Sequence, residues 1–302
     1  MKPVTLLATL ALSFLLLSCR NNKEDYDATG SFEATEIIVS SQANGRILTF
    51  NLNEGDQLLQ GQMVGAIDST QLHLQKMSLL SNARGVRAQQ PDIRKQTASI
   101  QEQINTLERE KARVQRLLAA NAANQKQLDD IEAQIELLQK QLLALTSTLE
   151  KSSENISAQS STLEIQVAQL DDQLEKTRII SPIAGTVLNR YAEAGELATM
   201  GTPLFKIADT DTMNLRAYVT NDQLAQIKLN DEVTVRVDDG DGDMKSYKGK
   251  INWISSKSEF TPKTIQTKNE RANLVYALKI AVPNDGFLKI GMYGEVKFNT
   301  SD

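Results

Sequence analysis

The feature that most constrains the fold is a stretch of 140 residues, from Asn51 to Arg190, that contains no Phe, Tyr or Trp. All 14 aromatic residues of the 302-residue chain lie outside it. Globular cores normally use such side chains as large anchors. Within this stretch, residues 70–177 also hold a single Gly and a single Pro. A chain of this length is expected to form about two domains, and this part is therefore expected to be helical rather than globular.

Apolar residues in this stretch recur every seven residues, with interleaved positions that divide the repeat into steps of three and four. The first run contains Ile93, Ile100, Ile104, Leu107, Val114 and Leu118. The second contains Leu128, Ile131, Ile135, Leu138, Leu142, Leu145 and Leu149, and resumes at Leu163, Val167, Leu170 and Leu174. This spacing is typical of the a/d seam of a coiled coil, whose thin Leu and Ile core needs no aromatic residue.

The two runs lose phase at residues 119–124, where two Asn residues suit a turn or a helix cap. The flanking arms, 70–120 and 125–176, have 51 and 52 residues. Equal arms predict an antiparallel hairpin over 70–177, about 75 Å long, in which residue i faces roughly residue 245 − i. The alternative is one continuous helix of about 105 residues that dimerises in parallel.

A helix-breaking segment, Gly85 to Pro91, is expected to face the serine-rich residues 152–161, which carry a poor seam. Helix breakers on one arm opposite weak packing on the other predict a kink or a frayed joint at this level of the hairpin.

The sequences on either side of the hairpin repeat each other. Glycines recur with the same spacing in both flanks and are followed by Ile67 and Ile207, respectively: Gly45, Gly55 and Gly61 in the first, Gly185, Gly195 and Gly201 in the second. Such glycines supply the turns between short strands. They predict two equivalent β-halves, residues 31–69 and 178–208. The pattern resembles the lipoyl or biotinyl carrier fold, but the lysine turn of a swinging-arm carrier is missing.

The N-terminus reads as an export signal. Residues 4–17 form an apolar run too short for a typical membrane span. The run ends in the residues Leu-Leu-Ser-Cys at 16–19, which resemble a bacterial lipobox. We therefore expect a signal peptide over residues 1–18, lipidation of Cys19, which would hold the protein at a membrane surface, and a polar tether over 19–30.

The C-terminal residues 209–302 alternate in polarity over about six short segments, which predicts a small antiparallel β-barrel. The fold class is thus mixed α and β, with a coiled-coil α-hairpin inserted in a split lipoyl-like domain and a β-barrel following it. A single Cys and a single His, His73, argue against disulfides, zinc sites and Ser-His-Asp catalysis. A net charge of −5 argues against nucleic acid as a partner. We expect no catalytic, cofactor or metal site.

This order of parts resembles the HlyD-like periplasmic adaptor family, also called membrane fusion proteins. Residues 180–187 look like that family's re-entry into the lipoyl domain, and residues 288–292 look like its final barrel turn. Segments 259–263 and 266–271 look like the branch that works with ABC transporters.

The resemblance implies a non-enzymatic adaptor that links an inner-membrane ABC transporter to a TolC-like outer-membrane channel. It further implies a ring of identical copies, expected to be a hexamer, located in the periplasm and anchored by lipid to the inner membrane. Family adaptors touch the channel through an Arg, a Leu and a Ser at the hairpin tip; Arg113, Leu117 and Asn124 occupy these spacings here, with Asn replacing Ser. The alternative is a lipid-anchored coiled-coil regulator of a cell-envelope enzyme, which would not need two lipoyl halves.

Overall fold

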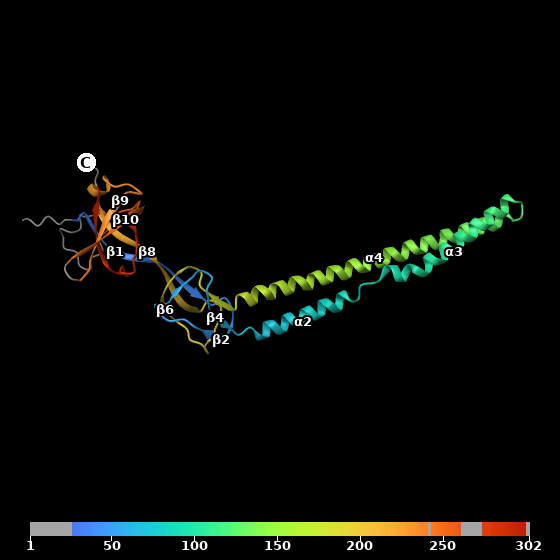
Figure 1. Cartoon of the computed structure of the whole chain (residues 1–302), viewed down its shortest axis with the longest axis horizontal. Helices are drawn as coiled ribbons and strands as arrows, with labels where there is room; N and C mark the ends of the chain where they lie inside the picture. Colours follow the sequence, from blue (N-terminus) through green and yellow to red (C-terminus); the bar gives the residue numbers. More distant parts are fainter. Residues whose placement is uncertain (1–25, 241–242, 261–273, 300–302) are drawn as a thin grey trace, which may run out of the picture.

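The structure, a computed structural model, describes residues 26–240, 243–260 and 274–299. It is an elongated molecule in which two β-domains follow one another at one end and a long helical hairpin projects from them (Figure 1). This arrangement confirms the expected fold class.

Three helices build the hairpin, and their bounds are α2 Thr70–Arg87, α3 Ile93–Ala119 and α4 Gln125–Glu175. Both α2 and α3 pack against α4, so the chain folds back on itself and does not form the alternative continuous helix. Ion pairs across the arms fix the register: Lys76 Nζ lies 2.5 Å from Asp171 Oδ1, and Lys111 Nζ lies 2.8 Å from Glu132 Oε1. Each facing residue is within two positions of the one expected from the sequence.

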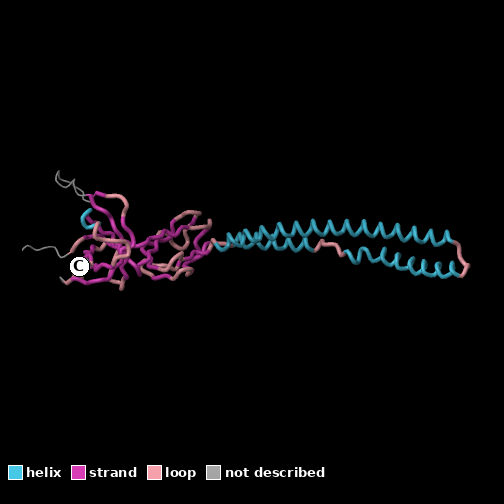
Figure 2. Tube along the Cα trace, turned by 90° about the horizontal axis from the view of Figure 1, so that it is seen from above, coloured by secondary structure: helices cyan, strands magenta, loops and turns pink. Residues whose placement is uncertain are grey.

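The first arm is interrupted between Arg87 and Ile93, while α4 runs past the interruption without a break (Figure 2). Pro91 disfavours helical backbone at the preceding residue and lacks an N–H for the helix ladder. Asp92 is the N-cap of the new helix, and its Oδ1 accepts from the backbone N–H of Lys95 at 3.1 Å. The predicted joint is therefore confirmed for the first arm. The serine-rich segment opposite stays helical.

Eight strands lead into and out of the hairpin. Their bounds are β1 Ala28–Ser40, β2 Gly45–Phe50, β3 Gln57–Leu58, β4 Met63–Ile67, β5 Arg178–Ile180, β6 Gly185–Arg190, β7 Leu197–Ala198 and β8 Pro203–Thr220. Parts of them form two sheets around one core, which contains Ile47, Phe50, Val187 and Phe205. The sandwich is thus assembled from both flanks of the hairpin.

The two flanks repeat each other with an offset of 140 residues, and they interlock. Strand β3 of the first flank pairs with β6 of the second, and β7 of the second pairs with β2 of the first. The backbone hydrogen bonds follow the same offset, since Ile47 N donates to Glu196 O at 2.8 Å and Val187 N donates to Asp56 O at 2.9 Å. Each half therefore completes the sheet of the other, and the hairpin can be inserted between them without disturbing the core.

The repeated glycines occupy equivalent places in the two halves. A Cβ on Gly185 would lie 2.2 Å from the carbonyl oxygen of Ala208, and one on Gly45 would lie 2.8 Å from Ile67 Cγ2. These two positions thus permit close approach of a neighbouring strand. The remaining four all have positive φ angles, at Gly55, Gly61, Gly195 and Gly201.

The second β-domain is a barrel. Its further elements are α5 Asn221–Leu224, β9 Glu232–Asp238, β10 Met244–Ile254, β11 Glu259–Phe260, β12 Leu274–Pro283 and β13 Tyr293–Phe298. Among the described residues, six strands close a ring in the order β1, β8, β12, β10, β9, β13 and back to β1. All pairings in this ring are antiparallel.

One of these barrel strands comes from the N-terminal part of the chain and corrects the expected boundaries. The sequence assigned residues 28–30 to the tether and the residues after them to the first lipoyl half. Instead, Ala28 and Phe32 are buried in the barrel core. The reason is that β1 and β8 are long strands that run from the sandwich into the barrel as a pair. The expected boundary at residues 208 and 209 therefore falls inside β8.

A bulge marks the passage from sandwich to barrel. Between the β1 pairings at Glu33 and Thr35, residues 210–213 of β8 leave the β1 ladder. Asn284, in the loop after β12, holds the bulge: its Nδ2 donates to the carbonyl oxygen of Thr210 at 2.9 Å. A bulge of this kind bends the strand, so this contact helps to set how the two β-domains are joined.

Candidate functional site

The hairpin tip, residues 119–124, is a compact turn at the far end of the molecule from the β-domains (Figure 1). Ala122 N donates to Leu117 O, and Asn121 N donates to Leu118 O, both at 2.9 Å. This is a Schellman motif, which requires a residue in left-handed conformation at the helix end. Asn121 takes that role with φ 50°, a conformation that Asn tolerates better than most residues.

Arg113 and Leu117 lie one turn apart on α3, so their side chains emerge on the same side of the helix. The Arg113 side chain is 64% exposed and donates to Glu110 Oε1 at 2.5 Å. Leu117 is 42% exposed, whereas the seam at this level is filled by Val114, which is buried. Leu117 is thus not a fully packed seam residue, and it leaves apolar surface beside a cation near the tip.

Asn124 is the N-cap of α4. Its Oδ1 accepts from the backbone N–H of Lys126 at 3.0 Å, which satisfies one of the free donors at the helix start. The oxygen is therefore used within the hairpin, while the amide nitrogen remains available as a donor. Ser and Asn are both favoured N-cap residues, so a Ser at this position would also suit the start of α4.

Other residues singled out by the sequence cannot be placed in the site. Cys19, the residue expected to carry lipid, lies outside the described residues. So do residues 261–263 and 266–271, which belong to the two segments that resemble the ABC-transporter branch. His73 is exposed on α2. In the part of the chain that the structure describes, no group of three or more His, Cys, Asp or Glu residues could hold a metal ion.

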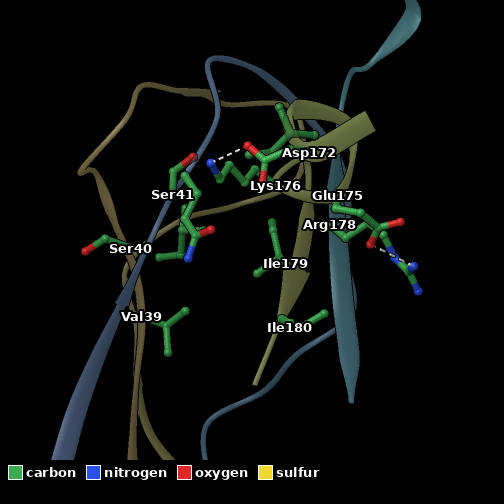
Figure 3. Close-up of a pocket in the computed structure, with 12 residues that line it drawn as sticks. Val39, Ser40, Ser41, Asp172, Glu175, Lys176, Arg178, Ile179 and Ile180 are labelled. Atoms are coloured by element: carbon green, nitrogen blue, oxygen red, sulfur yellow. Dashed lines mark hydrogen bonds and ion pairs between the residues drawn. The ribbon is translucent and has the colours of Figure 1, made fainter. Parts of the chain in front are cut away.

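A cleft of about 260 Å³ lies where the hairpin meets the sandwich (Figure 3). Its charged lining residues pair with one another: Lys176 Nζ lies 2.6 Å from Asp172 Oδ2, and Arg178 Nη1 lies 3.3 Å from Glu175 Oε2. The apolar wall includes Ile179. A larger hollow of about 680 Å³ adjoins this cleft and shares Asp172 and Lys176; both are open to solvent, whereas small-molecule sites usually enclose most of the ligand. We therefore interpret the cleft as the joint at the hairpin base.

A polar cluster reinforces the barrel next to the Asn284 contact. Lys245 Nζ lies 2.6 Å from Asp285 Oδ2, and the Tyr247 hydroxyl donates to Asp285 Oδ1 at 3.1 Å. The hydrogen bond from Lys245, followed by that from the Phe287 backbone N–H, lowers the pKa of Asp285 to about 2. This cluster ties β10 to the loop after β12 and so supports the barrel.

The sequence analysis did not single out Asn284, which links the loop after β12 to the bulge in β8. The available signal was the tripeptide Asn284-Asp285-Gly286, a strong turn sequence. Its side chain forms a local turn, because Oδ1 accepts from the backbone N–H groups of Gly286 and Leu288. The contact across to β8 depends on tertiary structure, and a turn signal does not reveal it.

Comparison with known proteins agrees with this architecture. Residues 35–210 match the family model described as RND MFP, barrel-sandwich hybrid domain. A UPF0194 membrane protein of Yersinia pseudotuberculosis (serotype O:3, strain YPIII) is 30% identical over 318 positions, which cover 98% of this chain and 95% of that protein. The chain therefore belongs to the membrane fusion protein family of HlyD-like periplasmic adaptors.

Solved structures share the fold at lower identity. MacA from Actinobacillus actinomycetemcomitans superposes with a TM-score of 0.51 at 21% identity, covering 89% of this chain and 76% of that one. The membrane fusion protein Spr0693 from Streptococcus pneumoniae R6 gives a TM-score of 0.51 at 18% identity, covering 91% and 98%. Among the described residues, no helix has the length and apolar character needed to cross a membrane.

Proposed function

We propose that this chain is the periplasmic adaptor of a tripartite efflux or secretion system, joining an inner-membrane ABC transporter to a TolC-like outer-membrane channel. The observation that carries the proposal is the tip. At the end of a hairpin about 75 Å long, a capped turn supports an exposed Arg113 and a partly exposed Leu117. Exposed Arg and apolar side chains on a rigid support suit docking to another protein.

In this proposal each part has a mechanical role. A lipid on Cys19 holds the base at the inner membrane. The barrel and the sandwich pack around the pump and around neighbouring copies as a ring, expected to be a hexamer. The hairpins form a tube across the periplasm, and their tips hold the channel open. The adaptor itself catalyses nothing, and the energy comes from ATP hydrolysis by the pump.

The choice of an ABC transporter is the finer part of the proposal. The matching family model is named for RND membrane fusion proteins, whereas segments 259–263 and 266–271 resemble the branch that works with ABC transporters. Co-purification of the membrane-bound chain with its pump tests the choice. Recovery of an ABC permease and its ATPase supports the proposal, and recovery of an RND pump contradicts it.

The tip assignment is tested by Arg113→Asp. Efflux and cross-linking to the channel should be lost, because a cation at the contact becomes an anion, while folding and membrane attachment stay intact. Arg109→Asp is the matched control, since Arg109 lies on the same helix, is 71% exposed and also pairs with a glutamate of its own helix. If efflux and channel cross-linking both persist in Arg113→Asp, the tip assignment is wrong.

A further inference from the structure

The two arms of the hairpin carry opposite charge. Residues 70–119 contain nine Lys or Arg and four Asp or Glu, a balance of +5. Residues 125–175 of α4 contain three Lys and ten Asp or Glu, a balance of −7. The hairpin as a whole is nearly neutral, so this segregation is invisible in the overall composition. It creates a positive edge and a negative edge along one rod.

Contacts between the arms use only part of this charge. Three ion pairs join the first arm to α4: Lys76 with Asp171, Arg87 with Glu164, and Lys111 with Glu132. Other charges on both arms are exposed and have no side-chain partner among the described residues. Those of the prevailing sign include Arg84 and Arg94 on the first arm, and Asp130, Glu150 and Glu154 on α4. Glu108 on the first arm and Lys126 and Lys151 on α4 are also exposed and unpartnered within the described part of the chain, but carry the opposite sign.

The unpaired charges of opposite sign lie at the same level of the rod. The pairs Lys76–Asp171 and Lys111–Glu132 define that level, and they place residue 94 beside residues 149–153 of α4. Glu150 lies in that range and Glu154 directly follows it. No contact joins Arg94 to either glutamate within the hairpin, so these charges face outward and are available to another molecule.

We propose that the charged edges are a recognition surface for a second copy of this chain, with the first arm of one copy lying against α4 of the next. The inference rests on the proposed function in one respect: copies anchored at one membrane have parallel orientations. In that orientation, Arg94 of one copy is level with Glu150 and Glu154 of its neighbour. Contacts between two first arms, or between two α4 helices, place like charges together.

Such a contact is heterologous, because each copy offers a different edge to each neighbour. A heterologous contact generates a ring when its rotation closes. Exposed ion pairs contribute little affinity individually, but complementary edges select the correct partner and penalise the wrong one. We therefore infer that the charge segregation determines the order of the arms around the ring. The β-domains provide further contact area.

Single cysteines at the same level test the order of arms. Ala98 and Thr148 are exposed, one on each arm. The full chain is expressed in membranes as two differently tagged copies, one with Ala98→Cys and one with Thr148→Cys, and treated with a short thiol cross-linker. Mixed expression should give a cross-linked dimer carrying both tags. Each variant alone should give at least fivefold less dimer, as should the chain with Cys19 only. Equal or stronger dimer from either variant alone overturns the inference.

Charge reversal then tests whether the charged edges cause this pairing of arms. Arg84→Glu with Arg94→Glu in the first-arm copy should lower the mixed dimer at least fivefold, and Glu150→Lys with Glu154→Lys in the α4 copy should do the same. Combining the two reversed copies should restore it, while Arg94→Lys should leave it unchanged. Raising the salt concentration should weaken the native contact, because exposed charges are screened. Failure of the combined reversal to restore the dimer overturns the inference.

The test of arm pairing can be distinguished from the test of the adaptor function. Arg113→Asp at the tip should abolish efflux without changing the dimer between the two cysteine copies. If the dimer is absent while efflux still depends on Arg113, the adaptor function stands and the arm pairing is wrong. If the dimer forms but efflux never depends on the chain, the pairing stands and the adaptor function is wrong.

Discussion

The double role of Asn124 gives the most detailed prediction. Asn124→Ala removes the Oδ1 atom that accepts from the Lys126 N–H at 3.0 Å. Loss of an N-cap costs typically about 1 kcal/mol, which corresponds to roughly fivefold more frequent opening of the first turn. The effect should be local, because α4 has 51 residues and is held against α2 and α3 along its length.

Hydrogen exchange followed by mass spectrometry measures this opening. Peptides that cover residues 124–130 should exchange about fivefold faster in Asn124→Ala, and peptides from α2 should be unchanged. Asn124→Ser and Asn124→Asp both keep a capping oxygen and should exchange like the wild type. Wild-type exchange in Asn124→Ala would refute the reasoning, since it would mean that the cap contributes nothing to the tip.

The same variants separate capping from docking. Asp keeps the acceptor but has no amide donor, whereas Ser has a hydroxyl that can donate. If the free amide of Asn124 contacts the channel, Asn124→Asp should lose cross-linking to it although the tip stays capped. Asn124→Ser should retain it. Equal cross-linking of both variants would show that only the cap matters at this position.

Three further predictions concern the β-domains and helix α2. Gly185→Ala should destabilise the sandwich by about 1–3 kcal/mol, because the new Cβ would lie 2.2 Å from a backbone oxygen, and a lowered melting temperature would register it. Gly85→Ala, a matched control in α2 with nothing within 4 Å of the new Cβ, should instead slow local hydrogen exchange by stabilising the helix by about 1 kcal/mol. Asp285 has its pKa lowered to about 2 from 3.8, so its ion pair stabilises the fold above pH 4 and loses this effect as the pH falls toward 2. Asp285→Asn should therefore melt below the wild type at pH 6 and match it near pH 2; a constant difference would contradict this assignment.

Periodic signals explain which parts of the fold were predictable. The heptads indicated the helices and the equal arms indicated the hairpin. The expected register holds to within two residues at Lys76–Asp171 and Lys111–Glu132, whereas Arg87 reaches Glu164, six positions from the residue expected. Pro91 marked the joint, since the loss of a backbone donor acts locally and is visible in one residue. The spacing of Gly45 and Gly185 revealed the two halves, because close strand approach excludes a Cβ at both positions.

Features that depend on distant contacts were not predictable in the same way. Residues 28–34 were assigned to the tether and to the start of the first lipoyl half, yet they complete the barrel because β1 continues beyond the sandwich to pair with β13. The sequence carries no turn where one domain ends, and so no boundary is visible. At the tip, the resemblance to the adaptor family pointed to Arg113, Leu117 and Asn124, but the cap formed by Asn124 required the backbone geometry.

The central claim, that the hairpin tip docks to an outer-membrane channel, is tested most directly by cross-linking from the tip in living cells. Ala122→Cys is the preferred position, because Ala122 is exposed and the neighbouring Asn121 needs its left-handed backbone. The full chain is cross-linked in intact cells and its partner is identified by mass spectrometry. The account predicts a TolC-like outer-membrane protein, lost when Arg113→Asp is added. Capture of a cell-wall hydrolase instead, unaffected by that substitution, would contradict it.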